Sequence, residues 1–567
     1  MHWMERLSSL KRAAEEVVFG ARTVGRVAIQ TKMPSHVRWA GLEATARELL
    51  RTRKATPPLL FHFMAHNDPH TVGLVGLSAS PSGRLVEDRA YSFQEMNERI
   101  ERIAAGLAER GVRPGDRIAL MIKNRPEFVL LQIAAGKLGC GAVSCSFRST
   151  SSELEYVATH SGARALFLDV DVAETVREAA PKLAEIGGER CFSVGGEVAS
   201  FPTLEALVAS AKGPPPKPGD DPAVVMYTSG TTGKPKGAVR QFAKGATSAA
   251  FAFIGETPME MGEVHLAVCP LYHATAFGFI TMSYLVGSTV IVLRDFRPES
   301  FLEAIERYRV TTTAVVPTML HRIVELGEEK LRRYDTSSLK AIFTGGAAIS
   351  IPLANEVLRL FGDKLFNFYG ATETGVVTLA KPADLRAAPG TIGRTIPGAE
   401  VRLYDEAGRV CGPGEVGELY ARSGQLFSGY HADDAGTRDA MRDGFFSVGD
   451  LARRDERGYF FLEGRKRDMI ISGGVNVYPA EVEQVLHDHP AVAEVAIVGV
   501  PDEAWGERVR AFVVLKAGAH AESKELEAFA RARLSGAKVP REFVFVPSLP
   551  RNPTGKVLKR ELRAMAL

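Results

Sequence analysis

The residues from Tyr227 to Gly237 combine side chains that suit the binding of a polyanion. The segment reads Tyr227-Thr-Ser-Gly-Thr-Thr-Gly-Lys-Pro-Lys-Gly237 and follows an apolar run that we expect to form a buried strand. Glycines let backbone N–H groups turn toward one point, hydroxyls donate hydrogen bonds, and lysines supply positive charge. The residues that we expect to contact phosphate groups are Thr228, Ser229, Gly230, Thr231, Thr232, Gly233, Lys234 and Lys236.

This loop differs from a Walker A loop in its spacing. Counted from Gly230, the second glycine of the Walker A pattern falls on Pro235, so the pattern fails. Composition alone also leaves open an ordinary surface loop. The complete string, placed directly after a strand, favours a phosphate-binding site.

Five further motifs follow along the chain, and each alone has an ordinary interpretation as a turn, a cap or a charged tail. They are Tyr369-Gly-Ala-Thr-Glu373, Ser447-Val-Gly-Asp450, Gly464-Arg465 with Asp468, Ser472-Gly-Gly474 and Pro553-Thr-Gly-Lys556. Together with the loop, and in this order, they resemble the signatures of the adenylate-forming superfamily over roughly residues 60–560. That superfamily includes acyl-CoA synthetases, in particular fatty-acid–CoA ligases, peptide-synthetase adenylation domains and firefly luciferase.

The resemblance implies a nucleotide site built from several of these motifs. Tyr369 would lie against adenine, Asp450 would accept hydrogen bonds from the ribose hydroxyls, and Arg465 would add a donor there. The remaining residues assigned to this side are Gly345, Gly346, Ala347 and Gly370, while Gly473 and Gly474 match a loop that lines the thiol channel. The resemblance implies ATP and coenzyme A as co-substrates and Mg²⁺ as cofactor.

The resemblance assigns four residues to the reaction centre, namely Lys556, Thr372, Glu373 and His273. Thr372 would bond the α-phosphate, and Glu373 would hold Mg²⁺ through its hard carboxylate oxygens. The Lys556 ammonium would bridge the substrate carboxylate and the α-phosphate, because a cation offsets the repulsion between two anions. His273 matches a position beside the acyl pocket. We do not expect it to act as a general base, since a carboxylate nucleophile is already ionised at pH 7.

The implied reaction has two steps. The carboxylate attacks the α-phosphorus of ATP and pyrophosphate leaves, and then a thiol, expected to be that of coenzyme A, takes the acyl group. In relatives the small C-terminal domain rotates between these steps. The hinge position falls on Arg467, with Asp468 adjacent, so the pivot residue stays open.

Alternating helix and strand signals must position these motifs. Ser92 and Glu95 indicate a capping box before a helix over residues 94–110, and Pro126 opens a second helix that ends near Gly139. Short apolar runs predict buried strands over residues 116–122, 165–168, 224–227, 289–293, 314–316 and 341–343. Such alternation predicts α/β layers with largely parallel sheets.

The C-terminal part of the chain has a different pattern. Beyond about Ala399 the segments become short and glycine-rich, which is typical of a small β unit. The last segment predicts strands over residues 469–471, 492–500 and 509–515 and helices over residues 480–487 and 523–534.

The predicted fold class is therefore α/β, with a large N-terminal domain of layered α/β sheets plus a small β unit, and a mobile, smaller α+β C-terminal domain. The predicted boundaries are 1–54 for a basic helical extension, 55–463 for the large domain, 464–468 for a hinge and 469–567 for the small domain.

Composition excludes several other classes. Of the 567 residues, 45% are hydrophobic and 24% charged, which is typical of globular proteins, and the net charge of +3 does not indicate a nucleic-acid binder. The five cysteines lack C-x-x-C spacing and predict neither a disulfide framework nor a zinc site. The first twenty residues show no secretory signal, and the apolar stretch 128–147 predicts a buried helix and strand rather than a membrane span. We therefore expect a cytoplasmic protein.

Residues 1–54 are rich in arginine and lysine and carry helical periodicity. Two interpretations stay open: an exposed helical extension packed on the body, and a basic amphipathic segment in peripheral contact with anionic lipid. A homodimer also stays open.

Gly370 bears on the size of the acid. In relatives restricted to acetate a tryptophan wall stands at this position, so we expect a pocket for a longer or aromatic acid. No lysine or arginine stands out as a partner for a second carboxylate. A medium- or long-chain fatty acid is the first hypothesis, and an aryl acid such as a cinnamate or benzoate is the second. Other open classes are an adenylation enzyme that loads a carrier protein, a luciferase-like oxygenase and a non-catalytic ATP-binding scaffold.

Overall fold

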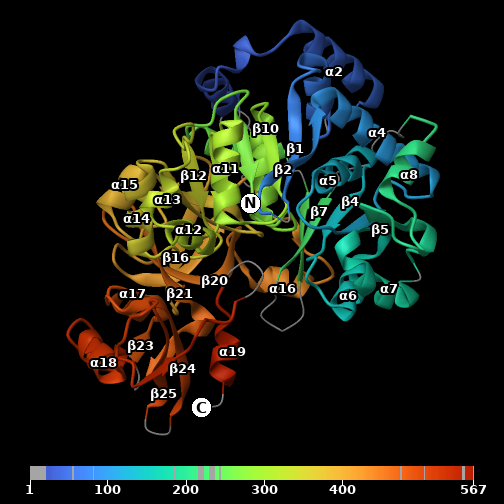
Figure 1. The fold of residues 1–567 in the computed structure, drawn as a ribbon. Helices are drawn as coiled ribbons and strands as arrows, with labels where there is room; N and C mark the ends of the chain where they lie inside the picture. Colours follow the sequence, from blue (N-terminus) through green and yellow to red (C-terminus); the bar gives the residue numbers. More distant parts are fainter. Residues whose placement is uncertain are drawn as a thin grey trace, which may run out of the picture.

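The structure is a computed structural model that describes residues 21–53, 57–80, 82–183, 185–214, 223–228, 236–241, 244–472, 475–502, 505–551 and 556–565. Figure 1 shows a large body, coloured blue to orange, and a small C-terminal body, coloured red. The large body contains two mixed sheets with helices on their faces and a smaller antiparallel sheet. This arrangement confirms the predicted α/β fold class with a large N-terminal domain and a smaller C-terminal domain (Figure 1).

The first large sheet has nine strands in the order β15-β14-β13-β12-β11-β9-β10-β1-β2. Pairing is parallel from β1 through β10, β9, β11 and β12 to β13, and antiparallel where β2, β14 and β15 join. The strands are β1 (Val72–Ala79), β2 (Leu85–Ser92), β9 (Val264–Ala267), β10 (Thr289–Leu293), β11 (Thr312–Val315), β12 (Ala341–Thr344), β13 (Leu365–Ala371), β14 (Gly375–Ala380) and β15 (Arg394–Thr395).

The second large sheet has seven strands in the order β18-β8-β7-β4-β3-β5-β6. They are β3 (Arg117–Met121), β4 (Gly141–Ser144), β5 (Ala163–Asp169), β6 (Cys191–Val194), β7 (Ala223–Thr228), β8 (Lys236–Gln241) and β18 (Gly429–Tyr430). Among the described residues of this sheet, β7 pairs antiparallel with β8 and β8 pairs antiparallel with β18, while the other pairings are parallel. The prediction of largely parallel sheets is therefore confirmed, and antiparallel pairing occurs at the edges, where strands such as β2 and β14 turn straight back on the preceding strand.

Helices fill the space between the two large sheets and cover their outer faces. Along β3, Ile118 and Leu120 face one hydrophobic cluster while Ala119 and Met121 face another, so both faces of the sheet are buried. The helices are α2 (Trp39–Thr52), α3 (Leu59–Asn67), α4 (Phe93–Glu109), α5 (Pro126–Leu138), α6 (Ser151–Ser161), α7 (Ala173–Ala179), α8 (Leu204–Ser210), α9 (Lys244–Ile254), α10 (Ala274–Leu285), α11 (Pro298–Tyr308), α12 (Pro317–Val324), α13 (Glu328–Leu331), α14 (Ile351–Phe361), α15 (Pro382–Ala387) and α16 (Asp434–Asp439).

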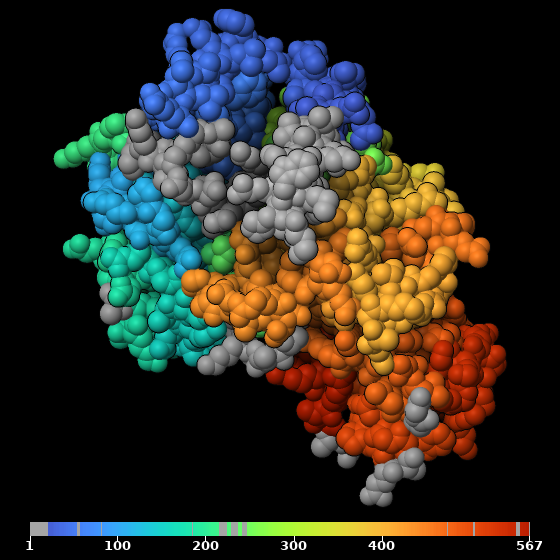
Figure 2. All heavy atoms as spheres, turned by 180° about the vertical axis from the view of Figure 1, so that it is seen from behind, coloured from blue at the N-terminus to red at the C-terminus, as the bar shows by residue number. Residues whose placement is uncertain are grey.

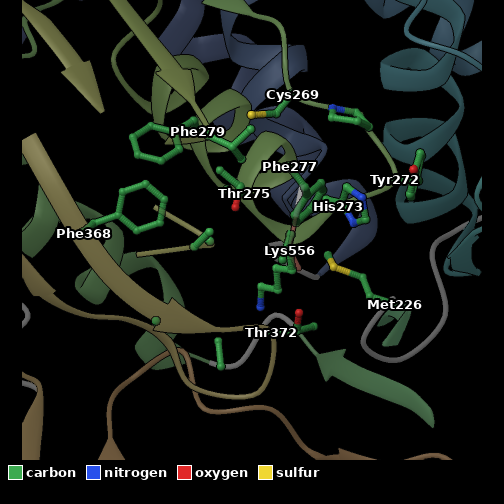
Figure 3. Close-up of a pocket in the computed structure, with 18 of the residues that line it drawn as sticks. Met226, Cys269, Tyr272, His273, Thr275, Phe277, Phe279, Phe368, Thr372 and Lys556 are labelled. Carbon is green, nitrogen blue, oxygen red and sulfur yellow. The ribbon is translucent and has the colours of Figure 1, made fainter. Parts of the chain in front are cut away.

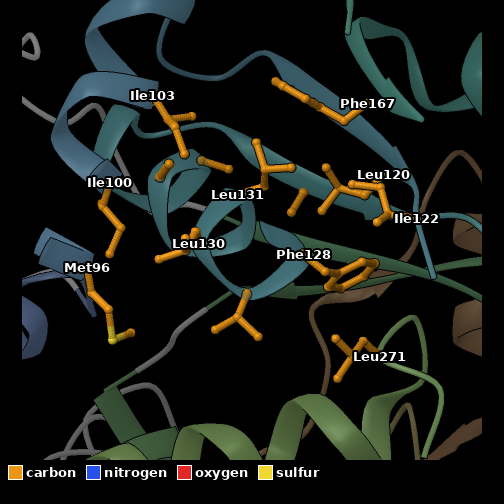
Figure 4. Close-up of a cluster of buried hydrophobic side chains, with 14 of the residues drawn as sticks. Met96, Ile100, Ile103, Leu120, Ile122, Phe128, Leu130, Leu131, Phe167 and Leu271 are labelled. Carbon is orange, nitrogen blue, oxygen red and sulfur yellow. The ribbon is translucent and has the colours of Figure 1, made fainter. Parts of the chain in front are cut away.

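Helix α5 lies at the centre of the core between the sheets. Figure 4 shows Phe128, Leu130 and Leu131 of α5 surrounded by side chains of α4, β3 and β5. These three residues are fully buried, which explains why the apolar stretch 128–147 has no polar face. No helix among the described residues has the length and apolar character needed to cross a membrane. The predicted buried helix and strand, α5 and β4, are confirmed.

The small antiparallel sheet and the C-terminal body complete the chain. The small sheet has the order β16-β17-β20-β19, with β21 paired to β20, and comprises β16 (Glu400–Tyr404), β17 (Val416–Arg422), β19 (Met441–Arg442), β20 (Phe445–Arg454) and β21 (Phe460–Arg465). The C-terminal sheet has the order β23-β22-β25-β24, with β26 paired to β25. Its elements are β22 (Ile470–Ser472), β23 (Val475–Val477), α17 (Pro479–His487), β24 (Val492–Asp502), β25 (Gly506–Leu515), α18 (Ser523–Arg531), β26 (Glu542–Phe545) and α19 (Lys559–Ala564).

Local signals confirm several predicted boundaries. The Ser92 side chain accepts from the backbone of Glu95 while Glu95 accepts from the backbone of Ser92, so the capping box before α4 is present. Helix α5 begins at Pro126 and ends at Leu138, and the capping residue Gly139 has a φ of 79°, the left-handed conformation that glycine adopts at low cost. The five cysteines are all buried free thiols.

The described part of the N-terminal extension is helical. Residues 21–30 form a helix, and α2 follows it. Val27 is fully buried against Phe251 and Ile254 of α9, so this segment packs on the body.

Candidate active site

A cavity of about 1950 Å³ is lined by residues of both large sheets, α10 and the C-terminal body. Figure 3 shows part of its wall, with the Lys556 side chain reaching into it toward Thr372. The cavity brings together motifs that lie far apart in the sequence. The predicted site residues that line it are Lys236, His273, Gly346, Ala347, Tyr369, Gly370, Thr372, Glu373, Asp450, Arg465 and Lys556.

The turn between β13 and β14 carries Thr372 and Glu373, and three separate segments hold its backbone. The guanidinium of Arg240 donates to the carbonyl of Thr372 at 2.5 Å. The backbone N–H of Phe427 donates to the carbonyl of Glu373 at 2.7 Å, and the Ser423 hydroxyl donates to the carbonyl of Thr374 at 2.6 Å. Because each carbonyl has its own donor, the turn holds one conformation.

The carboxylate of Glu373 is oriented by Tyr430. The Tyr430 hydroxyl donates to Glu373 Oε1 at 2.8 Å, and burial raises the pKa of this phenol well above its usual value. Glu373 is only 6% exposed yet borders the cavity. The ammonium of Lys236 lies 4.9 Å from the centre of the Tyr430 ring and pairs with Asp433 at 2.7 Å. The first residue after the undescribed part of the phosphate loop is thus held beside Glu373.

Asp450 lies between two donors from different elements. The hydroxyl of Tyr369 donates to Asp450 Oδ2 at 2.7 Å, and Arg465 Nε lies 3.2 Å from Oδ1. Asp450 and Arg465 are register partners on β20 and β21, which explains their juxtaposition. Asp450 lies inside β20 and not in a loop at its end. Burial, and then the neighbouring carboxylate, raises the pKa of Tyr369 well above its usual value.

Lys556 comes from the C-terminal body and enters the cavity of the large body. Its side chain is open to the cavity, yet the surrounding protein and the charge of Arg465 lower the pKa of its ammonium. The carboxylates of Asp450 and Glu373 act in the opposite direction. The lysine therefore stands where two carboxylates and a guanidinium converge, which fits a cation that contacts the anionic groups of a bound substrate.

His273 immediately precedes α10 as its N-cap residue. Burial, followed by the charge of Lys556, lowers its pKa to about 4, so the ring is neutral at pH 7. Its Nε2 is buried without a hydrogen-bond partner among the described residues. A neutral ring at the cavity wall agrees with the expectation that His273 does not act as a general base.

The predicted glycines have different surroundings. Gly346 and Gly370 line the cavity, whereas Gly345 packs against Phe368, whose ring an added Cβ would approach to 2.6 Å. An added Cβ at Gly370 would lie 2.1 Å from the carbonyl oxygen of Gly375. The close approach of the Gly375 backbone thus requires glycine at position 370. The presence of glycine here is therefore no evidence by itself for a wide acid pocket.

Part of the predicted site lies outside the described residues. Ser229, Gly230, Thr231, Thr232, Gly233 and Lys234 of the phosphate loop belong to this part, as do Gly473 and Gly474. Thr228 is the last residue of β7. The predicted strand before the loop is confirmed, and the roles of these residues stay predictions.

Arg240 and Tyr430 lie outside the sequence motifs that predicted the site. Burial lowers the pKa of Arg240, whose guanidinium lines the cavity near the carboxylate of Glu373. Its Nε is buried without a partner among the described residues. Arg240 therefore adds a buried guanidinium to the cavity wall, and the expectation that no lysine or arginine pairs with a second carboxylate of the acid stays a prediction. Strand alternation was the available signal, because Lys236 and Arg240 on one strand point to the same face. Tyr430 lies on a strand of two residues, which gives no periodic signal.

Glu373 is the residue best suited to hold a metal ion at this site. Among the described residues no group of three or more His, Cys, Asp or Glu side chains is arranged as a metal site. Mg²⁺ needs no such cage, because it binds through one or two carboxylates together with water and substrate phosphates. A single buried carboxylate, oriented by Tyr430 beside a lysine of the phosphate loop, fits that requirement.

Comparisons with known proteins agree with this geometry. The family model described as AMP-binding enzyme matches residues 65–431, and the model described as AMP-binding enzyme C-terminal domain matches residues 481–556. A feruloyl-CoA synthase from Amycolatopsis sp is 37% identical over 479 residues, which cover 84% of this chain and 94% of that protein. A long-chain-fatty-acid–CoA ligase from Bacillus subtilis (strain 168) is 32% identical over 505 residues, which cover 84% and 90%.

Solved structures also match over most of their length. The ATP-bound MatB from Rhodopseudomonas palustris is 28% identical, with a TM-score of 0.79, and the match covers 90% of this chain and 99% of that one. The o-succinylbenzoate-CoA synthetase from Bacillus subtilis, in complex with its acyl-adenylate, is 28% identical, with a TM-score of 0.77 and coverage of 89% and 97%.

Proposed function

Because the chain belongs to the AMP-binding enzyme family, we propose that it activates a medium- or long-chain fatty acid as its acyl-adenylate and transfers the acyl group to coenzyme A. The chain is an acid–thiol ligase of the adenylate-forming superfamily, and acyl- or aryl-CoA ligase activity follows from its relatives. Ligases of this family use ATP, Mg²⁺ and coenzyme A. The identity of the acid and the roles of individual residues are the parts that we propose.

The proposal of a fatty acid as substrate rests on the extent of the cavity. Its lining continues from Lys556 and Thr372 past Phe277 and Ile280 of α10 to Leu60 and Phe63 of α3. At Gly278 of α10, which also lines the cavity, an added Cβ would meet no heavy atom within 4 Å among the described residues. Such an apolar space suits an alkyl chain, whose transfer from water contributes about 0.8 kcal/mol per CH₂ group.

The geometry near Lys556 accounts for the adenylation step. The carboxylate of the acid must approach the α-phosphate of ATP closely enough for in-line attack, and both groups are anionic. Lys556 supplies the bridging cation, and Thr372 donates a hydrogen bond to the α-phosphate from a turn that Arg240 holds. The low-pKa imidazole of His273 stays neutral beside the acyl carbon and adds no charge there. Positioning and charge neutralisation are therefore the main contributions of the protein.

Asp450 and Glu373 hold the two ends of the nucleotide. Oδ2 of Asp450 accepts a hydrogen bond from Tyr369, Oδ1 forms an ion pair with Arg465, and each oxygen keeps a lone pair for a ribose hydroxyl. Glu373 would hold Mg²⁺, which neutralises the phosphates of the leaving pyrophosphate when it is bound. The loop over residues 228–236 would bind the outer phosphates, with Lys236 as its described end.

We also propose the domain boundaries 1–54, 55–463, 464–468 and 469–567, with the small domain pivoting at the hinge. Two ion pairs lie there: Lys466 with Glu418 at 2.9 Å, and Arg563 of α19 with Asp468 at 2.9 Å. The position of Lys556 in the cavity suits the adenylation step. Rotation at the hinge would withdraw it and bring the loop with Gly473 and Gly474 toward the thiol channel.

A second candidate is an aryl acid of the feruloyl type. The relative that favours it is the feruloyl-CoA synthase, at 37% identity over 84% of the chain. A carrier protein as acceptor is an alternative to free coenzyme A, and it is supported by a fatty acid–[acyl-carrier-protein] ligase from Streptomyces coeruleorubidus at 33% identity.

The test is a screen of AMP formation over straight-chain acids from acetate to stearate and over cinnamate, ferulate and benzoate, with and without coenzyme A. We expect the largest kcat/KM with a medium- or long-chain acid and a thioester product only when coenzyme A is present. A larger kcat/KM with ferulate would favour the second candidate. Thioester formation on a carrier protein but not on coenzyme A would favour the alternative acceptor.

A further inference from the structure

Helix α2 of the N-terminal extension presents an apolar face to solvent. Trp39, Leu42 and Leu50 are 77%, 47% and 79% exposed, and Leu49 is also exposed. Positions 39, 42, 46 and 50 recur at three- and four-residue intervals and therefore lie on one face of a helix. Ile29, in the helix that precedes α2, is 76% exposed. Large apolar side chains that gather on one exposed face mark a contact surface.

The opposite face of α2 fixes the orientation of the helix. An added Cβ at Gly41 would lie 2.8 Å from Phe63 and Asn67 of α3, so the two helices are in close contact. Glu48 pairs with Lys137 of α5 at 3.3 Å, and this lysine is buried. The outward direction of the apolar face thus follows from packing on the other side.

The net charge of residues 21–53 is positive. Residues 21–53 contain seven arginine or lysine residues against two glutamates. The cations are Arg22, Arg26, Lys32, Arg38, Arg47, Arg51 and Arg53. Several of them form ion pairs, such as Arg47 with Glu43, but their side chains stay exposed, and exposed pairs exchange partners at little cost. Apolar side chains flanked by arginine and lysine match an anionic lipid surface. The apolar side chains can insert at the boundary between headgroups and acyl chains, and the basic side chains can contact the anionic headgroups.

The same helix also borders the cavity. Thr45 of α2 lines it together with Leu59, Leu60 and Phe63 of α3. The end of the cavity that would hold the tail of an acyl chain therefore lies beneath the helix that carries the exposed apolar face. Figure 2 shows the N-terminal helices, in blue, at the end of the molecule away from the C-terminal body, in red. Contact through the blue end leaves the red body free to rotate.

We propose that the helix over residues 21–30 and α2 form a docking surface for an anionic lipid bilayer, and that the acid enters the cavity from the bilayer past α2 and α3. The entry of the acid rests on the proposed function, whereas docking does not. The family match begins at residue 65, so this surface lies outside the matched part of the chain.

The test is co-sedimentation of the full chain with vesicles of phosphatidylcholine alone and with vesicles that also contain phosphatidylglycerol. We expect binding to the anionic vesicles only, weakened by added salt, and weakened at least about tenfold in the triple variant Trp39→Ala, Leu42→Ser, Leu50→Ser. A matched control is Val410→Ser, which alters an aliphatic side chain of the small sheet region that is 55% exposed. It should bind vesicles as the unmodified chain does.

Three outcomes would overturn the proposal. The unmodified chain could stay in the supernatant with both kinds of vesicle, or the triple variant could bind as well as the unmodified chain. Light scattering could also show a dimer that the triple variant dissociates, which would assign the face to a second copy. AMP formation from dispersed acid is measured on the same samples. If the unmodified chain formed no AMP from any acid, the proposed function would be contradicted, whereas the vesicle-binding result would still test docking.

Discussion

The hydroxyl of Tyr430 donates a hydrogen bond of 2.8 Å to Oε1 of Glu373. The two residues are 57 positions apart, and β18 reaches the β13–β14 turn because it pairs with β8 at the edge of the second large sheet. Through this bond a strand at the edge of the second large sheet orients the carboxylate of Glu373, which lies in a turn of the first large sheet. The ammonium of Lys236 lies over the same phenol ring, so the tyrosine connects the phosphate loop to the proposed Mg²⁺ ligand.

Replacing Tyr430 with phenylalanine should weaken Mg²⁺ binding more than it changes the KM of the acid. A hydrogen bond to a charged group contributes about 1.5–3 kcal/mol, so we expect the Mg²⁺ concentration for half-maximal pyrophosphate release to rise roughly tenfold. Tyr420→Phe, in the small sheet, is the control and should behave as the unmodified chain. An unchanged Mg²⁺ dependence in Tyr430→Phe would show that the tyrosine does not position Glu373 for the metal.

Replacing Gly278 with leucine should make the enzyme reject long-chain acids while it still accepts short ones. The new side chain would enter open space in the cavity, and a helical glycine replaced by leucine costs no helix stability. We expect kcat/KM for palmitate to fall about tenfold or more while that for a short acid changes little. The chain-length profile of AMP formation measures this. Gly536→Leu, which also enters open space but in the C-terminal body, is the control; a parallel loss for all chain lengths would place the acyl tail elsewhere.

Lys556→Ala should separate the two half-reactions. Without the bridging ammonium, formation of the acyl-adenylate should fall by at least about 100-fold, because two anions then meet uncompensated. Thioester formation from a supplied acyl-adenylate should be largely retained. Single-turnover kinetics of each step measure the two rates. Lys516→Ala, at an exposed position of the same body, is the control; equal loss of both half-reactions would refute the assigned role.

Stability should fall as the pH is lowered because two histidines are buried in the neutral form. Burial lowers the pKa of His265 to about 3 and that of His273 to about 4. An unfolded histidine binds a proton below about pH 6.5, so the unfolded state takes up more protons as the pH falls from 6.5 toward these values. At pH 5 the His265 contribution alone is a loss of about 2 kcal/mol.

The measurement for this pH effect is denaturant unfolding at pH 8 and pH 5. The variant His265→Asn should show a smaller difference between the two pH values than the unmodified chain, whereas His70→Asn, at an exposed position, should show the same difference. An equal pH dependence in His265→Asn and the unmodified chain would contradict the assignment.

The sequence predicted the centres of the sheets well because the signal there is strong and local. Strand β10 has the predicted bounds, Thr289–Leu293, since a run of β-branched and aliphatic residues buried on both faces needs no neighbour to identify it. Some of the strands that it missed are short: β23 and β26 have three and four residues, and no period emerges over such lengths. Others, such as β1 and β2, have eight residues each. The antiparallel pairing of the edge strands was not predicted for another reason: the direction in which two strands pair depends on the turn between them and on the partner strand.

The candidate site was predictable where a motif carries its own chemistry. Tyr369, Asp450 and Arg465 were named from separate motifs, and the structure joins them through one carboxylate. Arg240 was missed because its importance comes from a tertiary contact, the hydrogen bond to the carbonyl of Thr372 132 positions away. Residues that position a site act through the fold, and a single sequence contains little information about such partners.

The most direct test of the central claim follows an oxygen atom. An acid labelled with oxygen-18 in its carboxylate is incubated with the enzyme, ATP, Mg²⁺ and coenzyme A, and the products are analysed by mass spectrometry. Attack of the carboxylate on the α-phosphorus transfers one labelled oxygen to AMP when the thioester forms, and pyrophosphate stays unlabelled. Unlabelled AMP, or ADP together with labelled phosphate, would contradict the account.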